Sequence, residues 1–230
     1  MPFCSHCGAD NPNEARYCHN CGRPLVSPET AHSPSSVASP QSVSRIELPG
    51  LRTVISPTRV ITMTVLSYGL YFFYWFFVTW KHYRDYSKEE AYPVWHTLTL
   101  LVPVYGLFRT HAHVRTYREL AASHGVLSTL APGWVVLGVA VSGALDWASF
   151  RSSLWGQSQG GAVLMVLVDA LSMAISAVVV LHVQGNLNRF WRSLQEVQAM
   201  PAAVGVGEVV TGIIGALAWV GTIMSLAGLA

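Results

Sequence analysis

Charge is scarce in this sequence. Only 11% of its 230 residues are Asp, Glu, Lys or Arg, against about a quarter in an ordinary soluble domain. Residues 55–230 contain ten Lys or Arg and eight Asp or Glu, which makes 18 charges in 176 residues. So few charges cannot solvate the surface of a water-soluble globule of this size, which excludes most soluble enzymes. The net charge of +2 is close to neutral, so we expect no specific nucleic-acid partner.

Two common catalytic motifs and spare cysteines are missing as well. The sequence contains neither the phosphate-binding pattern G-x-x-x-x-G-K-[ST] nor the metalloprotease pattern H-E-x-x-H. No cysteine follows residue 21, so none is left as a nucleophile if the first four bind a metal. These observations predict that the protein is not an enzyme.

All four cysteines stand near the N-terminus, in the patterns C-S-H-C-G at residues 4–8 and C-H-N-C-G at residues 18–22. Two thiolates three residues apart can bind one ion from a tight turn, and the glycine that follows permits the positive φ of that turn. Two such knuckles supply four sulfurs, which suits a closed tetrahedral zinc site. The sequence therefore predicts one structural Zn²⁺, bound by Cys4, Cys7, Cys18 and Cys21.

The four cysteines have two other possible uses besides binding zinc. Two disulfides need an oxidising compartment, and no secretory signal peptide precedes the knuckles. An iron centre of the rubredoxin type uses similar knuckles, but normally at a greater separation than the ten residues found here. His6 and His19 lie inside the knuckles, where solvated loop residues are a simpler interpretation than metal ligands.

Residues 3–25, from F-C-S-H-C-G to Y-C-H-N-C-G-R-P-L, resemble the short zinc ribbon at the N-terminus of many prokaryotic membrane proteins. The resemblance covers about a tenth of the chain. Such a short segment cannot bury a core of its own, so metal binding would supply its folding free energy.

The rest of the chain predicts a linker and a membrane domain. Residues 26–45 hold ten Ser or Pro in twenty positions, which favours disorder. The predicted domains are a zinc ribbon at residues 1–25, a disordered linker at 26–55 and a multi-pass transmembrane domain at 56–230.

Five apolar runs are candidates for membrane-spanning helices. They lie at residues 60–80, 94–108, 130–150, 162–183 and 209–230. The second run has 15 residues and contains Pro103, so it is short for a span and is expected to be kinked or re-entrant if it does not cross. The predicted fold is therefore an all-α helical membrane bundle with about five transmembrane helices, or four without the second run.

The distribution of Lys and Arg predicts the orientation. With five spans and a cytoplasmic N-terminus, eight basic residues lie inside and four outside. The inside residues are Arg45, Arg52, Arg59, Arg109, Arg115, Arg118, Arg189 and Arg192, and the outside residues are Lys81, Arg84, Lys88 and Arg151. This bias predicts a plasma-membrane protein with a cytoplasmic zinc ribbon.

A second resemblance concerns the first apolar run. The segment G-L-Y-x-x-Y-W at residues 69–75, followed by the basic stretch at 81–84, is similar to the G-I-Y-x-x-Y-W signature of a bacterial multi-pass membrane domain of unknown function. The resemblance covers residues 55–121 and departs after Trp75, where the run stays aromatic. It implies a small head fused to membrane helices and no established activity.

Two groups of polar residues are further candidates. Asp169 lies within the fourth run and Asp146 near the end of the third, and carboxylates in such places often mark ion or proton paths. The alternatives are a hydrogen-bonded helix contact for Asp169 and an interfacial role for Asp146. A basic stripe after the second run could bind lipid head groups or another anion, or could simply fix the topology. It comprises Arg109, His111, Arg115 and Arg118.

The sequence is compatible with two functions. The first is an integral membrane protein whose cytoplasmic zinc ribbon acts as an interaction or sensing module and binds a cytoplasmic protein partner at the bilayer. The alternative is a small transporter or channel that uses Asp169. Small residues repeat every fourth position in the later runs, which favours close helix packing and would allow a homo-oligomer.

Overall fold

The computed structural model describes residues 4, 7, 9–12, 15, 17–21, 50–153, 159–194 and 198–228. The chain divides into two compact units, residues 1–46 and 47–230. Residues 26–49 of the predicted linker lie outside the described residues. The last residues assigned to that linker form a strand.

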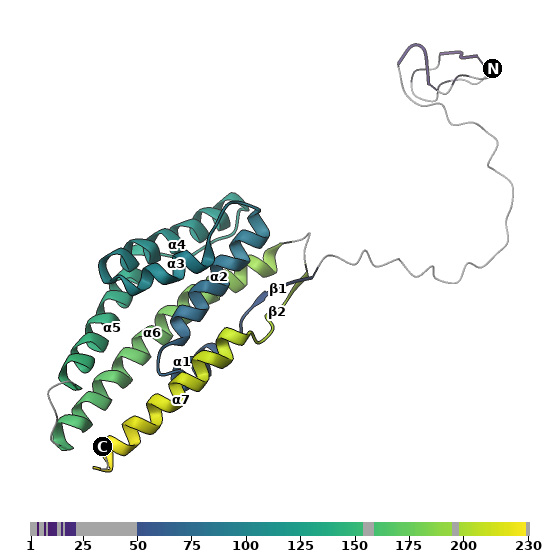
Figure 1. Cartoon of the computed structure of the whole chain (residues 1–230). Coiled ribbons are helices and arrows are strands. Elements are labelled where there is room, and N and C mark those ends of the chain that lie inside the picture. The colour runs from purple at the N-terminus through teal and green to yellow at the C-terminus, as the bar shows by residue number, and fades with distance from the viewer. Residues whose placement is uncertain are drawn as a thin grey trace, which may run out of the picture. The chain divides into compact units, whose positions relative to one another are not determined.

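The larger unit consists of helices and one pair of strands (Figure 1). Its elements are β1 (Gly50–Val54), α1 (Pro57–Leu66), α2 (Tyr71–Ser87), α3 (Pro93–Leu98), the 3₁₀ helix η2 (Thr99–Leu101), α4 (Pro103–Ser123), α5 (Pro132–Ser153), α6 (Gln159–Ser193), β2 (Gln198–Pro201) and α7 (Val206–Leu226). The fold is mostly helical, as predicted.

Three helices of the described part are long and apolar enough to cross a membrane: α5, α6 from Gly160 to Ser193, and α7. They correspond to the third, fourth and fifth predicted runs. Their outward surfaces carry large apolar side chains, such as Leu137 on α5, Leu167 on α6 and Leu217 on α7. In a bilayer these side chains face lipid, which accounts for their exposure.

The first predicted run, residues 60–80, is not one helix. Helix α1 ends at Leu66, and Tyr68 and Gly69 adopt positive φ values of 54° and 85° before α2 begins. The Ser67 hydroxyl accepts a hydrogen bond of 2.7 Å from the Tyr71 N–H, which satisfies one of the unpaired donors at the start of α2. The prediction of a single spanning helix here was therefore wrong.

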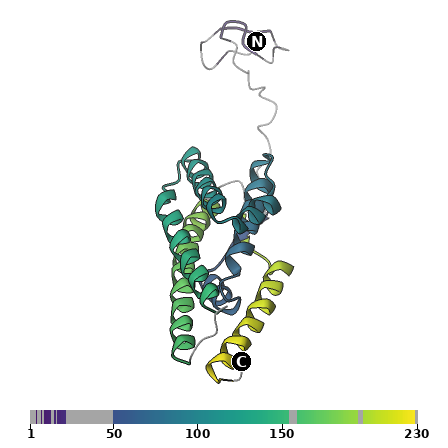
Figure 2. The same ribbon diagram turned by 60° about the vertical axis from the view of Figure 1, so that its left-hand side comes forward.

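Contacts with α7 show that the chain reverses at this break. The ring centroids of Tyr68 and Trp219 lie 5.0 Å apart, deep along α7. A few residues later, Tyr74 lies against Gly205 and Gly207, back at the start of α7. Helices α1 and α2 therefore form a hairpin, which we call the α1–α2 hairpin, and Figure 2 shows α1 beside α7. Irregular backbone is tolerated at membrane depth where protein covers it, and Ser67 is fully buried.

The second predicted run, residues 94–108, is divided among three elements. Helix α3 and η2 come first, and α4 begins at Pro103. Proline has no N–H to donate and is tolerated in a helix only in the first turn, which explains why α4 begins there. The predicted kink at Pro103 is present. Because neither this run nor residues 60–80 is among the helices that meet the length and hydropathy of a span, the described part offers three candidates in place of five.

An aromatic core joins α2, α4 and the C-terminal part of α6. Trp75 and Phe76 of α2, Tyr117 of α4, and Phe190 and Trp191 of α6 are each at most 2% exposed. The segments that follow the apolar runs thus pack here as in a soluble domain. Tryptophan is common at membrane interfaces, but Trp191 is a core residue.

The strands β1 and β2 pair in parallel, with Gly50 opposite Gln198 and Arg52 opposite Met200. Each strand precedes a helix, α1 or α7, and the two helix starts are joined by an ion pair between Arg59 and Glu208. The Arg59 Nε–H donates to Glu208 Oε1 over 2.7 Å, and burial of the carboxylate is thereby compensated. The hairpin and α7 are thus attached to each other where both leave the sheet.

Candidate functional site

The four predicted ligands meet at one point of the N-terminal unit. The sulfurs of Cys4, Cys7, Cys18 and Cys21 all lie within 4.8 Å of one another. Cys4 Sγ is 3.6 Å from Cys21 Sγ, and Cys7 Sγ is 3.5 Å from Cys18 Sγ. Within the first knuckle the Cys4 N–H donates to the Ala9 carbonyl over 3.0 Å, which closes the turn.

These distances fit a metal better than a disulfide. A tetrahedral ion with metal–sulfur bonds of about 2.3 Å places its sulfurs about 3.8 Å apart, whereas a disulfide requires about 2.05 Å. Burial of Cys18 opposes its ionisation, but the backbone N–H groups of Cys21 and Asn20 outweigh it and lower the pKa of the thiol to about 6. The cluster could therefore hold one metal ion, and its donor set is that of a closed structural site.

Asn11 supports this cluster and was not predicted from the sequence. Its side chain is 2% exposed, and its amide nitrogen donates to Ala9 O over 2.8 Å and lies 3.7 Å from Cys18 Sγ. Its oxygen accepts from the His19 N–H over 3.0 Å and lies 2.9 Å from His19 Nδ1. His19 is thus engaged by Asn11 and not by the sulfurs, as expected of a loop residue. His6 lies outside the described residues.

Asp169 belongs to α6 and lies against Tyr68 at the tip of the α1–α2 hairpin. The Tyr68 hydroxyl donates to Asp169 Oδ2 over 2.7 Å, and Thr222 of α7 donates to the same hydroxyl over 3.2 Å. Asp169 is half-buried. Asp146 on α5 lies close enough to interact electrostatically with Asp169. The two predicted carboxylates therefore lie near each other, with Asp169 half-buried at the hairpin turn and Asp146 exposed on α5.

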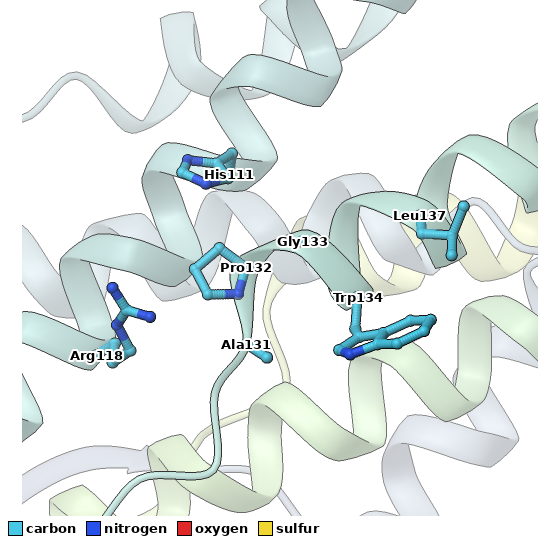
Figure 3. A pocket seen from close by; sticks show the side chains of 7 residues that line it. All are labelled: His111, Arg118, Ala131, Pro132, Gly133, Trp134 and Leu137. Atoms are coloured by element: carbon cyan, nitrogen blue, oxygen red, sulfur yellow. The ribbon is translucent and has the colours of Figure 1, made fainter.

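The four members of the basic stripe do not form one site. Arg109 contacts His96 of α3, and Arg115 Nε lies 3.6 Å from Glu119 Oε1 on the same helix. His111 and Arg118 line an open pocket of about 580 Å³ between α4 and the start of α5, shown in Figure 3.

The letters G-x-S-x-G occur once, at residues 156–160. In α/β-hydrolases this pattern marks a catalytic serine on a sharp turn between a strand and a helix. Here the element that precedes it is the helix α5, so the match lacks the structural context that would give it meaning.

Comparisons with known proteins give one match. A family model described as a domain of unknown function, DUF7577, matches residues 2–26, the segment that contains the four cysteines. No curated protein and no solved structure matches the chain. The match fits a zinc-ribbon-like head, while the resemblance of residues 55–121 to a membrane-domain family stays a prediction.

Proposed function

We propose that this is an integral membrane protein whose cytoplasmic zinc-ribbon head acts as an interaction or sensing module at the bilayer. The observation that carries the proposal is the four-thiol cluster in a unit of its own, on a chain whose other unit has three helices able to span a membrane. A site with four sulfur ligands leaves no position for a substrate, so the metal serves folding and not catalysis.

The arrangement of basic residues supports a cytoplasmic head. If α5, α6 and α7 are the spans, everything before residue 132 lies on the same side as the C-terminal end of α6. Ten of the eleven Lys and Arg in residues 47–230 then lie on this side, and Arg151 alone lies on the other. This is a stronger bias than the five-span assignment gives, and basic residues favour the cytoplasmic side.

Tethering gives the head its function without enzymatic activity. A binding module confined to the membrane surface meets a membrane-associated partner at an effective concentration set by the linker. Residues 26–49, predicted to be disordered, would let the head reach roughly 27 Å from its anchor, as a flexible chain of that length does. A cytoplasmic protein is the partner that this arrangement suits.

Replacement of one ligand tests the two-module arrangement. We expect Cys4→Ser to reduce zinc from about one per chain to nearly none in elemental analysis of the purified protein, because three ligands hold the ion far less well. The variant should still be recovered in the membrane fraction. His19→Ala is the matched control and should keep its zinc. Loss of insertion in Cys4→Ser would contradict the two-module arrangement.

The role in recruitment needs a separate experiment. Proximity labelling in cells, with the labelling enzyme fused to the N-terminus, should identify cytoplasmic neighbours of the wild-type head. Those neighbours should be lost in Cys4→Ser and kept in His19→Ala. An identical set of neighbours for Cys4→Ser and wild type would overturn the interaction role.

A second candidate is a small transporter or channel, favoured by the polar group around Asp169. The Tyr68 hydroxyl reaches this carboxylate from a hairpin turn at membrane depth, and Asp146 lies nearby. Carboxylates within membrane segments commonly serve ion or proton paths. This candidate predicts that Asp169→Asn abolishes proton or cation flux in proteoliposomes, whereas Glu119→Gln, on the exposed face of α4, leaves it unchanged. Equal flux in the wild type and Asp169→Asn would end it.

A further inference from the structure

The pocket between α4 and α5 lies where the chain enters the apolar part of the molecule. Its lining includes His111 and Arg118 from α4 and Pro132 to Trp134 from the first turn of α5 (Figure 3). Because α5 is a candidate span that begins at Pro132, its first turn is placed at the membrane surface. Trp134 is 74% exposed, as expected of a tryptophan at the level of the lipid head groups.

The basic side chains of this pocket are free to bind an anion. Among the ion pairs of the described residues, none includes His111 or Arg118, whereas the neighbouring Arg115 is paired with Glu119. Both side chains are exposed. The first turn of α5 adds the positive end of a long helix on the opposite wall. The pocket therefore has one guanidinium, one imidazole and a helix terminus, with no acidic group in its lining.

A second, almost entirely apolar pocket adjoins the first and shares His111 with it. This pocket has a volume of about 430 Å³ and is lined by Val104, Leu107 and Phe108 of α4 and by Val136 of α5. Val104 and Phe108 are 68% and 67% exposed, which is costly in water and favourable against acyl chains. A cationic pocket and an apolar groove thus lie side by side along one seam.

We propose that the α4–α5 seam binds an anionic phospholipid. The phosphate of the head group lies between Arg118, His111 and the first turn of α5, and an acyl chain lies along Val104, Phe108 and Val136. Neither pocket alone specifies a lipid, since a cationic pocket also suits a soluble phosphate and an apolar groove also suits a protein side chain. The two pockets meet at His111, at the depth where α5 enters the membrane. A phospholipid has both an anionic head group for the first pocket and an acyl chain for the second. The proposal is independent of the head and of its function.

The test is native mass spectrometry of the full-length protein in detergent, titrated with phosphatidylglycerol or with phosphatidylcholine of the same chains. We expect phosphatidylglycerol to be retained in preference. Arg118→Ala should weaken its retention about five-fold, as the loss of about 1 kcal/mol for one basic residue near the surface predicts. Arg115→Ala is the control of equal charge on the same helix, and its retention should match that of the wild type.

A steric pair of variants tests the pocket without altering charge. A Cβ at Gly133 meets no atom within 4 Å, and the same is true of Gly143 further along α5. Gly133→Leu should therefore fill the pocket and reduce retention, whereas Gly143→Leu should fold equally well and keep it. Glycerol phosphate, which has the head group without chains, should compete poorly with the intact lipid.

Three results would overturn the proposal. One is equal retention of the two lipids by the wild type, and another is undiminished retention in both Arg118→Ala and Gly133→Leu. The third is competition by glycerol phosphate as strong as by the lipid, which would assign the pocket to a soluble phosphate.

Discussion

At the scale of single residues, Gly215 of α7 determines how closely the α1–α2 hairpin can approach. A Cβ at this position would lie 2.2 Å from both Cα and C of Ser67, at the hairpin turn. Both atoms belong to the backbone, so no side-chain rotation can relieve the overlap. The sequence predicts that small residues allow close helix packing in the membrane. It does not predict that Gly215 is the residue that does so here, because this depends on the break at Ser67. No periodicity of the sequence predicts that break.

Gly215→Ala should therefore separate the hairpin from α7. Overpacking of this kind costs about 3 kcal/mol, which corresponds to a fall of roughly 6–12 °C in the unfolding midpoint of a chain of this size. The measurement is thermal unfolding in detergent, followed by near-ultraviolet circular dichroism. Gly212→Ala is the control, because a Cβ there meets Leu66 and Met63 at an ordinary 3.7 Å. A midpoint equal to that of the control would show that α7 does not pack against the turn.

His113 of α4 is a second residue whose role comes from its surroundings. It is 1% exposed, among the rings of Trp75, Phe76, Trp80 and Tyr117. The Thr79 hydroxyl donates to the Trp75 carbonyl over 2.9 Å, so it accepts from His113 Nε2 over 3.0 Å. Nδ1 then carries a lone pair and has no hydrogen-bond partner among the described residues. Burial lowers the pKa of His113 to about 3.

This pKa predicts a loss of stability in mild acid. The unfolded chain binds a proton at His113 below about pH 6.5, whereas the folded chain does not until about pH 3. Stability from this residue is thus complete above pH 6.5 and falls by up to about 1.4 kcal/mol per pH unit below it. Unfolding midpoints at pH 7.5, 6.5 and 5.5 should fall more steeply for the wild type than for His113→Gln. Parallel curves for the two proteins would contradict a buried neutral imidazole.

At the scale of elements, α6 serves two environments along its 35 residues. Its first half carries exposed Leu164, Leu167 and Leu171, as a lipid-facing helix does. Its second half is buried among α2, α4 and β1, with polar side chains paired inside. The Trp75 Nε1–H donates to Gln184 Oε1 over 2.7 Å, and Gln184 Nε2 donates to Asn188 Oδ1 over 2.7 Å.

Asn188 completes this network at the end of β1. Its amide nitrogen donates to the Ile55 carbonyl over 2.7 Å, and its oxygen accepts from the Ile55 N–H over 3.2 Å. Ile55 is 2% exposed, so both backbone groups lose their partner in Asn188→Ala. Each such loss costs about 1–3 kcal/mol, and we expect a destabilisation of about 3 kcal/mol by thermal unfolding in detergent. Arg189→Ala, on the exposed side of the same turn, should cost less than about 0.5 kcal/mol.

The sequence predicted those elements whose environment is uniform. Helices α5 and α7 and the first half of α6 carry exposed apolar side chains over most of their length, so length and hydropathy were enough. Residues 60–80 are equally apolar, yet they break where Tyr68 takes a positive φ, a conformation unfavourable for a bulky side chain. The contacts of Tyr68 with Asp169 and Trp219 stabilise it, and these lie more than a hundred residues away.

The same contrast holds for the metal cluster. The cysteines could be predicted because the spacing of two knuckles is a local property of the chain. Asn11 could not, because its contribution depends on the loop that folds over Cys18 and His19. A buried asparagine between two knuckles has no sequence pattern of its own.

At the scale of the whole molecule, the number of spans decides which side each basic segment occupies. With the proposed cytoplasmic head, five spans would place Lys88 and Arg151 together outside the cell. With the same head, three spans would place Lys88 on the cytoplasmic side, because α2 returns to the side from which α1 enters, and would leave Arg151 at the far end of α5. The described contacts favour three spans, since Tyr86 and His82 near the end of α2 pack against Trp191 at the end of α6.

The two topologies make opposite predictions for thiol labelling. With the four native cysteines replaced by serine, Lys88→Cys introduces an exposed thiol at the end of α2, and Ser152→Cys introduces a half-buried thiol beside Arg151. For three spans, a membrane-impermeant maleimide should label Ser152→Cys in intact cells and Lys88→Cys only in inverted vesicles. For five spans, both thiols should react from the same side. If residues 60–80 and 94–108 both cross the membrane, Lys88 changes sides and Ser152 does not. The comparison therefore tests the α1–α2 hairpin itself. Labelling of both thiols in intact cells would exclude the hairpin.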